Sequence, residues 1–350
     1  MVILGSIIAL IISFYLLAEI SDRYFVVSLD KISNKLNMSH DMAGATLMAI
    51  GSSAPELFVA IIAIFKPGGH ADIGIGTIVG SALFNLLVII GAVGIVKNTT
   101  LAWQLVVRDL LFYVIGIVAL FYVLNNGSVS MLEGAIFVAL YGVYVFSVVK
   151  WRRWFKYKTY DEDPEEEEDE PKKGLMRLFR PLDWFLELIF PKPKYYFVVF
   201  FISIAFIAAL CWILVESAII ISTTLQIPEV VVALTVLAVG TSVPDIMSSV
   251  IVAKQGRGGM AVSNGIGSNI FDIFIGLGLP WMIKSYLVDS ELVTNIEGLS
   301  ISIGLLFGSV LLLLFALIYQ RWRLSHRLGF VLILLYIAYV VWEIVKIYVY

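Results

Sequence analysis

The sequence contains a single cysteine and only three histidines, which removes several common kinds of site. Cys211 has no second cysteine to pair with, so an intramolecular disulfide is excluded. His40, His70 and His326 are scattered and show no spacing typical of a zinc site. We also find no His-Glu-x-x-His motif, nucleophile elbow or phosphate-binding loop. The sequence therefore gives no indication of an enzyme, a catalytic residue or a prosthetic group.

Charge is scarce as well. Charged residues make up 15% of the 350 residues, whereas soluble domains average about 25%. Hydrophobic residues make up 60%, which is more than the roughly 45–50% of a soluble domain. One water-soluble core cannot bury that much apolar surface, so lipid is its natural solvent. We therefore expect an integral membrane protein with the lipid bilayer, and no nucleic acid, as its surroundings.

Long apolar runs fill most of the chain. A helix that crosses a bilayer needs about 20 mostly apolar residues, and ten such runs can be counted. We interpret the first run as a retained helix, because no basic residues precede it as they would in a signal peptide. The fold class is thus all-α, with about ten transmembrane helices. The predicted spans are 2–20, 41–65, 72–97, 101–123, 130–150, 195–223, 229–254, 259–284, 298–320 and 326–346.

The basic residues predict the orientation of these spans. If the N-terminus lies outside, only Lys66, Lys284 and Lys346 of the 24 Lys and Arg residues fall on the outer side. Short loops that are rich in Lys and Arg remain cytoplasmic. We therefore expect a multi-pass protein of the cell (plasma) membrane with both termini outside.

One segment differs from the rest and divides the chain. An acidic run extends from Asp161 to Glu170, and such a run repels itself and stays solvated. The following residues, 175–190, mix apolar and basic side chains and suit a helix in the membrane interface. We expect a five-helix unit in 1–150, a cytoplasmic acidic loop in 151–194 and a second five-helix unit in 195–350.

The two units share an internal repeat. Gly51-Ser52-Ser53-Ala54-Pro55-Glu56 matches Gly240-Thr241-Ser242-Val243-Pro244-Asp245, and Gly80-Ser81-Ala82-Leu83-Phe84-Asn85 matches Gly267-Ser268-Asn269-Ile270-Phe271-Asp272. Because each unit has an odd number of spans, the second crosses the membrane upside down. Inverted-topology repeats are typical of secondary transporters with a site at the membrane midplane. We interpret Gly80 and Gly267 as positions of close helix packing.

Three acids, Glu56, Asp245 and Asp272, lie within apolar spans. An acid there costs about 2.5–3.5 kcal/mol on insertion scales, and bound cations would compensate for it. Pro55 and Pro244 directly precede two of the acids and free backbone carbonyls nearby. A hydroxyl side chain stands one helical turn before each of these acids and before Asn85. The hydroxyl residues are Ser52, Thr241, Ser81 and Ser268, which precede Glu56, Asp245, Asn85 and Asp272 in that order.

Such an all-oxygen set suits hard cations, and calcium in particular binds six to eight oxygens. Three ionised carboxylates exceed the charge of one calcium ion by one negative charge. Either a potassium ion or a proton on Asp272 would neutralise that charge, and the residues leave both open.

With these motifs the sequence resembles the sodium/calcium exchanger superfamily, and its potassium-dependent branch most closely. The resemblance implies that Glu56 and Asp245 are the central calcium ligands, and that the first and sixth spans form a gate sliding past the core. It further implies hydroxyl ligands from Ser52, Ser53, Thr241 and Ser242, and backbone carbonyl ligands for sodium from Ala49 and Ala238. Ser81, Asn85, Ser268 and Asp272 would complete the set, with Asp272 associated with potassium transport.

Other functions remain as alternatives. A calcium/proton antiporter of the same fold is the nearest, although such proteins typically show Gly-Asn before the key acid, where this chain has Gly51-Ser52 and Gly240-Thr241. A cation channel could use the acids in a filter, but one site per inverted repeat is the transporter pattern. An intramembrane aspartyl enzyme would need two facing aspartates, such as Asp245 and Asp272. The sequence does not determine stoichiometry or oligomeric state.

Overall fold

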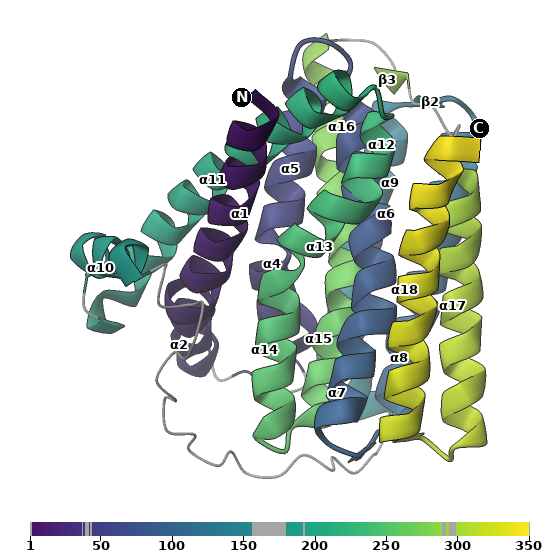
Figure 1. Ribbon diagram of the computed structural model, residues 1–350. Helices are drawn as coiled ribbons and strands as arrows, with labels where there is room; N and C mark the ends of the chain where they lie inside the picture. Colours follow the sequence, from purple (N-terminus) through teal and green to yellow (C-terminus); the bar gives the residue numbers. More distant parts are fainter. Residues whose placement is uncertain are drawn as a thin grey trace.

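The computed structural model describes residues 2–36, 38, 42, 44–155, 180–191, 193–288, 292–293 and 299–349. Almost all of these residues are helical (Figure 1). The acidic run 161–170 and His40 lie outside the described residues, so the predictions made for them stay predictions.

The helices of the first half are mostly long, with short π-helical segments (η) inserted. They are α1 (Val2–Ile20), η1 (Ser21–Val26), α2 (Val27–Lys35), η2 (Gly44–Met48), α4 (Ala49–Ser52), α5 (Ala54–Phe65), α6 (Ala71–Phe84), η3 (Asn85–Ile89), α7 (Ile90–Val96), α8 (Trp103–Asn125) and α9 (Met131–Trp154). Two short strands, β1 (Thr99–Thr100) and β2 (Ser128–Val129), flank α8.

The second half repeats this plan after an additional helix, α10 (Arg180–Ile189). Its elements are η5 (Pro193–Tyr195, a 3-10 turn), α11 (Tyr196–Leu225), α12 (Glu229–Val232), η6 (Ala233–Leu237), α13 (Ala238–Thr241), α14 (Val243–Lys254), α15 (Gly258–Phe271), η7 (Asp272–Leu277), α16 (Gly278–Val288), β3 (Leu292–Val293), α17 (Ser300–Tyr319), β4 (Arg323–Leu324) and α18 (His326–Val349).

The described helices confirm the predicted number of spans. Nine of them are long and apolar enough to cross a membrane, and a pair bent by 51°, Thr46–Ser52 with Ala54–Phe65, makes a tenth. The first span is longer than predicted, because the helix runs from Val2 to Lys35 rather than ending at residue 20. Arg23 lies near Glu19 and Glu187, at 3.5 and 3.4 Å, so this charge has partners and does not end the helix.

The two halves are inverted relative to each other, as Figure 1 shows. The chain rises through α4 and α5 but descends through α12, α13 and α14, and it descends through α6 and α7 but rises through α15 and α16. Both termini lie at the same end of the molecule.

Two small β-ladders connect the halves. Antiparallel β1 and β4 pair Thr99 with Leu324, and antiparallel β2 and β3 pair Ser128 with Val293. β1 and β3 each precede the long helix that follows a motif segment, α8 or α17, while β2 and β4 each follow it. Exchanging the halves therefore converts one ladder into the other, as a twofold relation requires.

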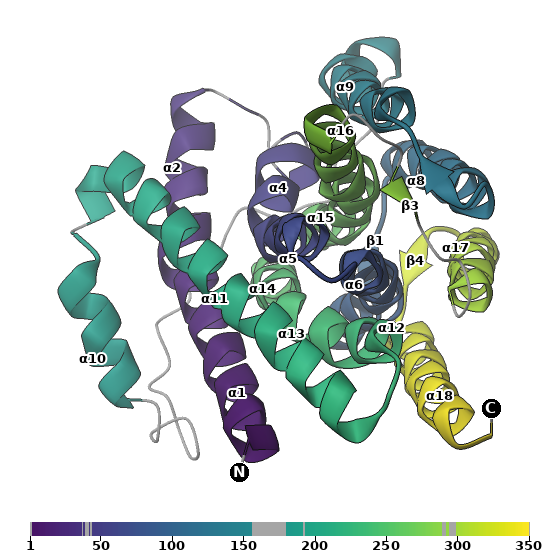
Figure 2. The same ribbon diagram turned by 90° about the horizontal axis from the view of Figure 1, so that it is seen from above.

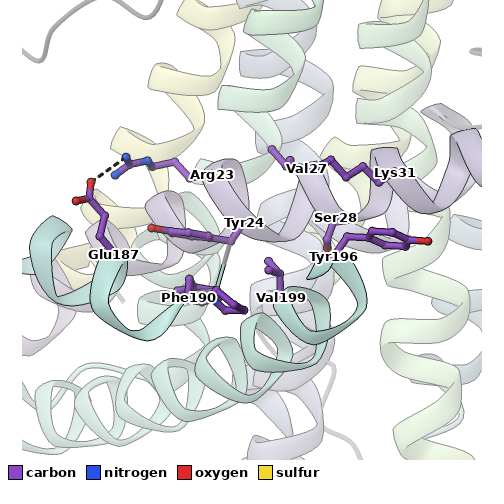
Figure 3. Close-up of a pocket in the computed structure, with 10 residues that line it drawn as sticks. Arg23, Tyr24, Val27, Ser28, Lys31, Glu187, Phe190, Tyr196 and Val199 are labelled. Atoms are coloured by element: carbon purple, nitrogen blue, oxygen red, sulfur yellow. Dashed lines mark hydrogen bonds and ion pairs between the residues drawn. The ribbon is translucent and has the colours of Figure 1, made fainter. Parts of the chain in front are cut away.

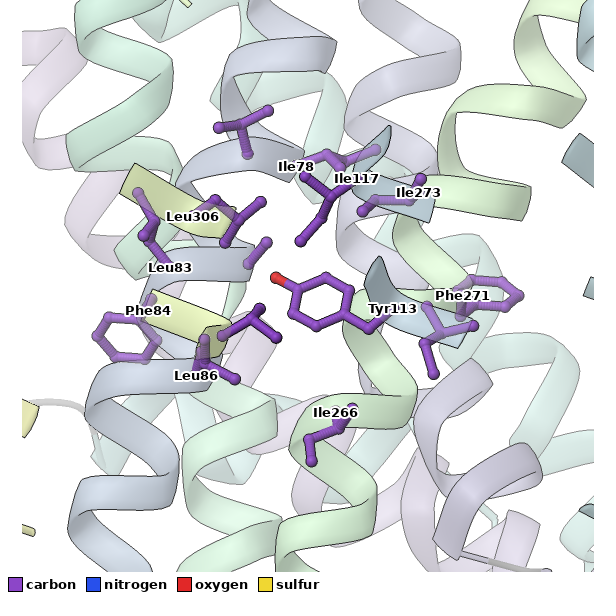
Figure 4. Packing of buried hydrophobic residues seen from close by; sticks show 14 of the residues in the cluster. Ile78, Leu83, Phe84, Leu86, Tyr113, Ile117, Ile266, Phe271, Ile273 and Leu306 are labelled. Carbon is purple, nitrogen blue, oxygen red and sulfur yellow. The ribbon is translucent and has the colours of Figure 1, made fainter. Parts of the chain in front are cut away.

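The buried apolar residues form two groups. The larger group lies in a bundle formed by α6 to α9 and α15 to α18, and Figure 4 shows Tyr113 of α8 surrounded by residues such as Leu83, Ile266 and Ile273. The smaller group joins α1, α2 and α11 to α5 and η6. Seen from above in Figure 2, α1, α2, α10 and α11 lie to one side of the bundle. The layout divides the molecule into a bundle and a pair of crossing helices beside it.

Close packing between the halves depends on small residues, as the sequence predicts for Gly80. A Cβ at Gly80 would lie 2.6 Å from the Cβ of Ala238, and one at Gly76 would lie 2.9 Å from the Cβ of Ala233. Gly265 is different, because its nearest neighbour would be at an ordinary 3.6 Å, on Ile89. The tight contact thus lies between α6 and the η6–α13 segment.

Candidate cation-binding site

Ten polar side chains proposed from the sequence meet in the interior, where four segments cross. Each is at most 1% exposed, although together they carry three carboxyl groups and an amide. They come from the α4–α5 break, the α13–α14 break, the α6–η3 junction and the α15–η7 junction, and they are Ser52, Ser53, Glu56, Ser81, Asn85, Thr241, Ser242, Asp245, Ser268 and Asp272.

The two breaks have nearly the same geometry. Ser53 has φ −87° and ψ 7°, and Ser242 has φ −84° and ψ 5°, so both residues leave the regular helix. Pro55 and Pro244 then occupy the first turns of α5 and α14, where a missing N–H costs no helical hydrogen bond. Glu56 and Asp245 consequently stand at helix N-termini, and the aligned N–H groups there favour negative charge.

The halves donate hydrogen bonds to each other's acids. Asn85 Nδ2 donates to Asp245 Oδ2 at 2.9 Å. Ser268, which belongs to the same half as Asp245, donates from its Oγ to Asp245 Oδ1 at 3.1 Å. Ser242 Oγ donates to Glu56 Oε1 at 3.2 Å. Ser81 Oγ donates to Asp272 Oδ2 at 3.5 Å. Each acid is therefore positioned in part by the opposite repeat.

Four buried oxygens in this cluster have no hydrogen-bond partner. They are Ser53 Oγ, Glu56 Oε2, Asn85 Oδ1 and Asp272 Oδ1. A buried polar atom without a partner costs roughly 1–3 kcal/mol, so such atoms are few in native proteins, and four within one cluster need an explanation. Every one of them is an oxygen that could act as a ligand, which is the donor set that a hard cation requires.

The three acids do not form a compact metal cluster by themselves. Among the described residues, no group of three His, Cys, Asp or Glu side chains is placed to hold a metal ion. Hydroxyl and amide groups donate to the three carboxylates instead. The Ala49 and Ala238 carbonyls accept hydrogen bonds from the Ser53 and Ser242 amides, at 3.0 and 3.3 Å, and the Ala49 carbonyl also accepts from Ser52 Oγ at 3.5 Å.

Four π-helical segments at the site were not predicted from the sequence. η3 begins at Asn85 and η7 begins at Asp272, while η2 and η6 lead into the two breaks. A π-helical turn widens the helix and redirects the side chains that follow, and such turns occur frequently at functional sites. The side chains at these positions therefore do not keep the regular α-helical spacing that the sequence predicts.

The first span contacts both breaks, and the sixth contacts the first of them. Phe14 of α1 packs against Gly240, and Leu29 of α2 packs against Gly51, so neither glycine leaves room for a Cβ. Cys211 of α11 lies with its Sγ 3.5 Å from the Pro55 carbonyl oxygen. The first and sixth spans thus lie against the site, and Figure 2 shows them beside the bundle.

A cavity beside these helices is not part of the site. It lies between η1, α2, α10 and the start of α11, and Figure 3 shows Arg23 with Glu187 near one end and Lys31 near the other. None of the ten clustered polar residues lines it. The buried oxygens, rather than the open cavity, therefore mark the candidate site.

The fold and the site define a class: helical membrane carriers built from inverted repeats around a buried, oxygen-rich centre. Comparison with known proteins gives the family. The family described as "Sodium/calcium exchanger protein" matches residues 6–150 and 195–345. This chain belongs to that family.

Individual relatives agree with this assignment. Human sodium/potassium/calcium exchanger 5 is 33% identical, and the match covers 95% of this chain and 82% of that protein. Mouse sodium/potassium/calcium exchanger 4 is 28% identical, with 98% and 81% covered. A solved structure of the sodium-calcium exchanger NCX_Mj, soaked with sodium and strontium, is similar with a TM-score of 0.62 and 26% identity, covering 97% of this chain and 98% of that one.

Proposed function

We propose that the chain exchanges sodium for calcium across a membrane by alternating access, with potassium carried along with calcium. The observation that carries this proposal is the group of four unpartnered oxygens on Ser53, Glu56, Asn85 and Asp272. Supporting it are relatives that are named as sodium/potassium/calcium exchangers and a similar solved structure that is named as a sodium-calcium exchanger. The transported ions are substrates.

Each half contributes one calcium-binding carboxylate. Glu56 and Asp245 coordinate calcium, helped by hydroxyls of Ser52, Ser53, Thr241 and Ser242. The Ala49 and Ala238 carbonyls face sodium. Ser81, Asn85 and Ser268 complete the shell, and Asp272 binds potassium. The full set supplies only oxygen ligands, whereas a site for soft metal ions would use Cys or His ligands.

The protein should not switch access from one side of the membrane to the other while its site is empty, because the carboxylates would then be buried without a compensating cation. This requirement couples the flux of sodium to that of calcium. The helices that pack on Gly51 and Gly240 move relative to the bundle and expose the site to one face at a time.

The division of the chain follows the same proposal. Residues 1–150 and 195–350 are the two five-helix repeats, and 151–194 is a cytoplasmic loop. The end of the molecule that carries Lys97, Lys254, Arg257 and Arg323 faces the cytoplasm, by the bias of Lys and Arg toward that side. Both termini then lie outside, and we place the protein in the plasma membrane.

The deciding experiment measures calcium uptake into proteoliposomes that are loaded with sodium. We expect uptake that requires the outward sodium gradient and that increases when potassium is added with calcium. Uptake driven by a pH gradient without sodium would identify a calcium/proton antiporter instead. Ion currents far above carrier rates would identify a channel.

Replacing Asp272 with asparagine should remove the potassium dependence. The substitution gives the second repeat the amide that the first repeat has at Asn85, so one negative charge is lost while the side chain keeps its size. Sodium-dependent calcium uptake by Asp272→Asn should then be equal with and without potassium.

Ser81→Ala is the matched control for this variant. Ser81 donates a hydrogen bond to Asp272, so its removal should shift the potassium concentration for half-maximal uptake without removing the dependence. An unchanged potassium requirement in Asp272→Asn would contradict the role of this residue.

A further inference from the structure

An ion pair joins the sixth span, α11, to the bundle at the end of the molecule that carries both termini, which the proposed orientation places outside. Lys66 Nζ at the end of α5 pairs with Glu216 Oε1 on α11, 150 positions away in the chain. The ammonium also lies 5.3 Å from the ring centroid of Trp212. Trp212 stands one turn before Glu216, on the same face of α11. Three side chains from two helices thus meet at a point away from the candidate cation-binding site.

Local structure favours this pair at its position. α5 ends at Phe65, and the backbone becomes extended at Lys66, with φ −69° and ψ 133°. The aligned carbonyl groups at a helix C-terminus stabilise a positive charge there. The Lys66 side chain is 17% exposed and the Glu216 side chain 40%, so water reaches the pair. Ion pairs in such surroundings add little stability, which suits a contact that must break in every transport cycle.

Between the ion pair and the candidate site, α11 covers one face of α5. Val59 and Ala63 of α5 are fully buried in the smaller apolar group, which also contains residues of α11. Farther in, Cys211 Sγ of α11 lies 3.5 Å from the carbonyl oxygen of Pro55, the residue before Glu56. Opening the site toward the outside along α5 therefore requires α11 to leave this face, which separates the ion pair.

The chain turns back into the bundle directly after α11. Gln226, which follows the last residue of α11, has a φ of 56°, a left-handed conformation that commonly ends helices. Glu229 then begins α12, and its Oε2 lies 2.9 Å from Nδ1 of His70, just before α6. A Cβ at Gly76 of α6 would lie 3.2 Å from the Val230 carbonyl oxygen, so α12 packs closely on α6. The His70 pair thus lies within the bundle, whereas the first pair joins the bundle to the helix beside it.

The first span, which the inverted repeat relates to the sixth, has ion pairs of another kind. Arg23 lies 3.5 Å from Glu19 of α1 and 3.4 Å from Glu187 of α10. Figure 2 shows α1 and α10 beside the bundle, so these two ion pairs do not hold the first span to it. They add no preference for closure of the cytoplasmic end, while the Lys66 pair favours closure of the outer end.

We propose that Lys66, Glu216 and Trp212 form a latch that holds the outer end of the sixth span on the bundle and so sets the equilibrium between the inward-open and outward-open states. The inference rests on the proposed function, because it requires α11 to move together with α1, with which it shares the smaller apolar group. Breaking the latch favours the outward-open state without changing any ion ligand. The ratio of outward-open to inward-open protein should then rise about twofold to fivefold, the scale of one partly exposed ion pair.

Cys211 provides the readout, because it is the single cysteine of the chain and is buried where α11 meets Pro55. The experiment measures how fast a membrane-impermeant maleimide, added outside right-side-out vesicles in choline chloride, labels this thiol. We expect Glu216→Gln and Lys66→Met each to raise the labelling rate about twofold to fivefold, since the thiol reacts only while α11 is away from α5. Cys211→Ala protein gives the background.

Glu229→Gln is the matched control, because it removes an acid from an ion pair at the same end of the molecule that lies within the bundle. It should leave the labelling rate unchanged. Lys66→Arg keeps the positive charge and should also label like the wild type. A rise in Glu229→Gln as large as that in Glu216→Gln would indicate a general loosening of this end and would overturn the proposal. An unchanged rate in both Glu216→Gln and Lys66→Met would overturn it as well.

Transport gives a second readout, which a general loss of stability would not produce. The apparent affinity for an ion falls as the fraction of protein in the competent state falls. The external sodium concentration for half-maximal exchange, divided by the cytoplasmic one, should therefore decrease by the same factor in the two latch variants. If wild-type protein shows no sodium-driven calcium flux but the labelling difference is present, the exchanger proposal fails and the latch stands. If flux is present and labelling does not differ, the latch fails.

Discussion

Glu56→Gln and Asp245→Asn are each expected to reduce sodium-driven calcium uptake by about 100-fold or more, which corresponds to at least ~2.7 kcal/mol of lost calcium binding. Each substitution keeps the size of the side chain but removes one negative charge from the centre of the site. The amide also places an N–H₂ group where an oxygen now stands. In Glu56→Gln the affected atoms include Oε2, which has no partner within the protein.

The measurement is initial calcium uptake into sodium-loaded proteoliposomes, normalised to the amount of reconstituted protein. Glu343→Gln is the matched control, because Glu343 is another fully buried acid in a predicted span. Ser302 Oγ donates a hydrogen bond to its Oε1 at 3.1 Å, and Lys346 Nζ forms an ion pair with its Oε2 at 3.7 Å. This control should retain uptake within about threefold, well short of one decade. Normal uptake by Glu56→Gln or Asp245→Asn would refute the assignment of the site.

Gly80→Val is expected to have the largest effect on stability. Its side chain would begin 2.6 Å from the Cβ of Ala238 and 2.9 Å from the carbonyl carbon of Leu234, so α6 and the η6–α13 segment would have to separate. Overpacking of this kind costs about 1–3 kcal/mol or more, and a backbone cannot move aside as a flexible side chain does. We expect a melting temperature lowered by about 2–4 °C, or a protein that cannot be purified.

Transport should be lost in the same variant, because Gly80 precedes Ser81 and lies against the segment that leads to Thr241. The melting temperature is measured on the detergent-purified protein, with size-exclusion chromatography after heating to monitor unfolding. Gly265→Ala is the control, since its Cβ would meet only an ordinary contact at 3.6 Å. If Gly80→Val melted like the wild type, the close approach of the repeats at this point would be wrong.

Much of the site could be read from the sequence, because its cost is visible there. Acids such as Glu56, Asp245 and Asp272 are rare in apolar spans, and two motifs that recur in the same order locate the partners of those acids. The structure buries all ten side chains that were predicted from these motifs and from the family resemblance. Their roles as ligands remain the proposal that the variants above test.

Other features had no signal in the sequence. The π-helical turns at Asn85 and Asp272 depend on how the helices pack, and no residue type marks them. The first helix continues past the predicted end at residue 20, because Arg23 finds Glu19 and Glu187 on neighbouring turns and on α10. Hydropathy counts each charge alone and so ends the span too early.

By itself, the sequence determined the membrane setting, the number of spans and the inverted repeat, since the length of apolar runs and the spacing of motifs are properties of the chain alone. Only the tertiary structure decided which groups face each other: that Asn85 of one repeat holds Asp245 of the other, and that Lys66 pairs with Glu216. The reason is physical. A hydrogen bond between residues 160 positions apart depends on the crossing of helices in space, which local sequence does not encode.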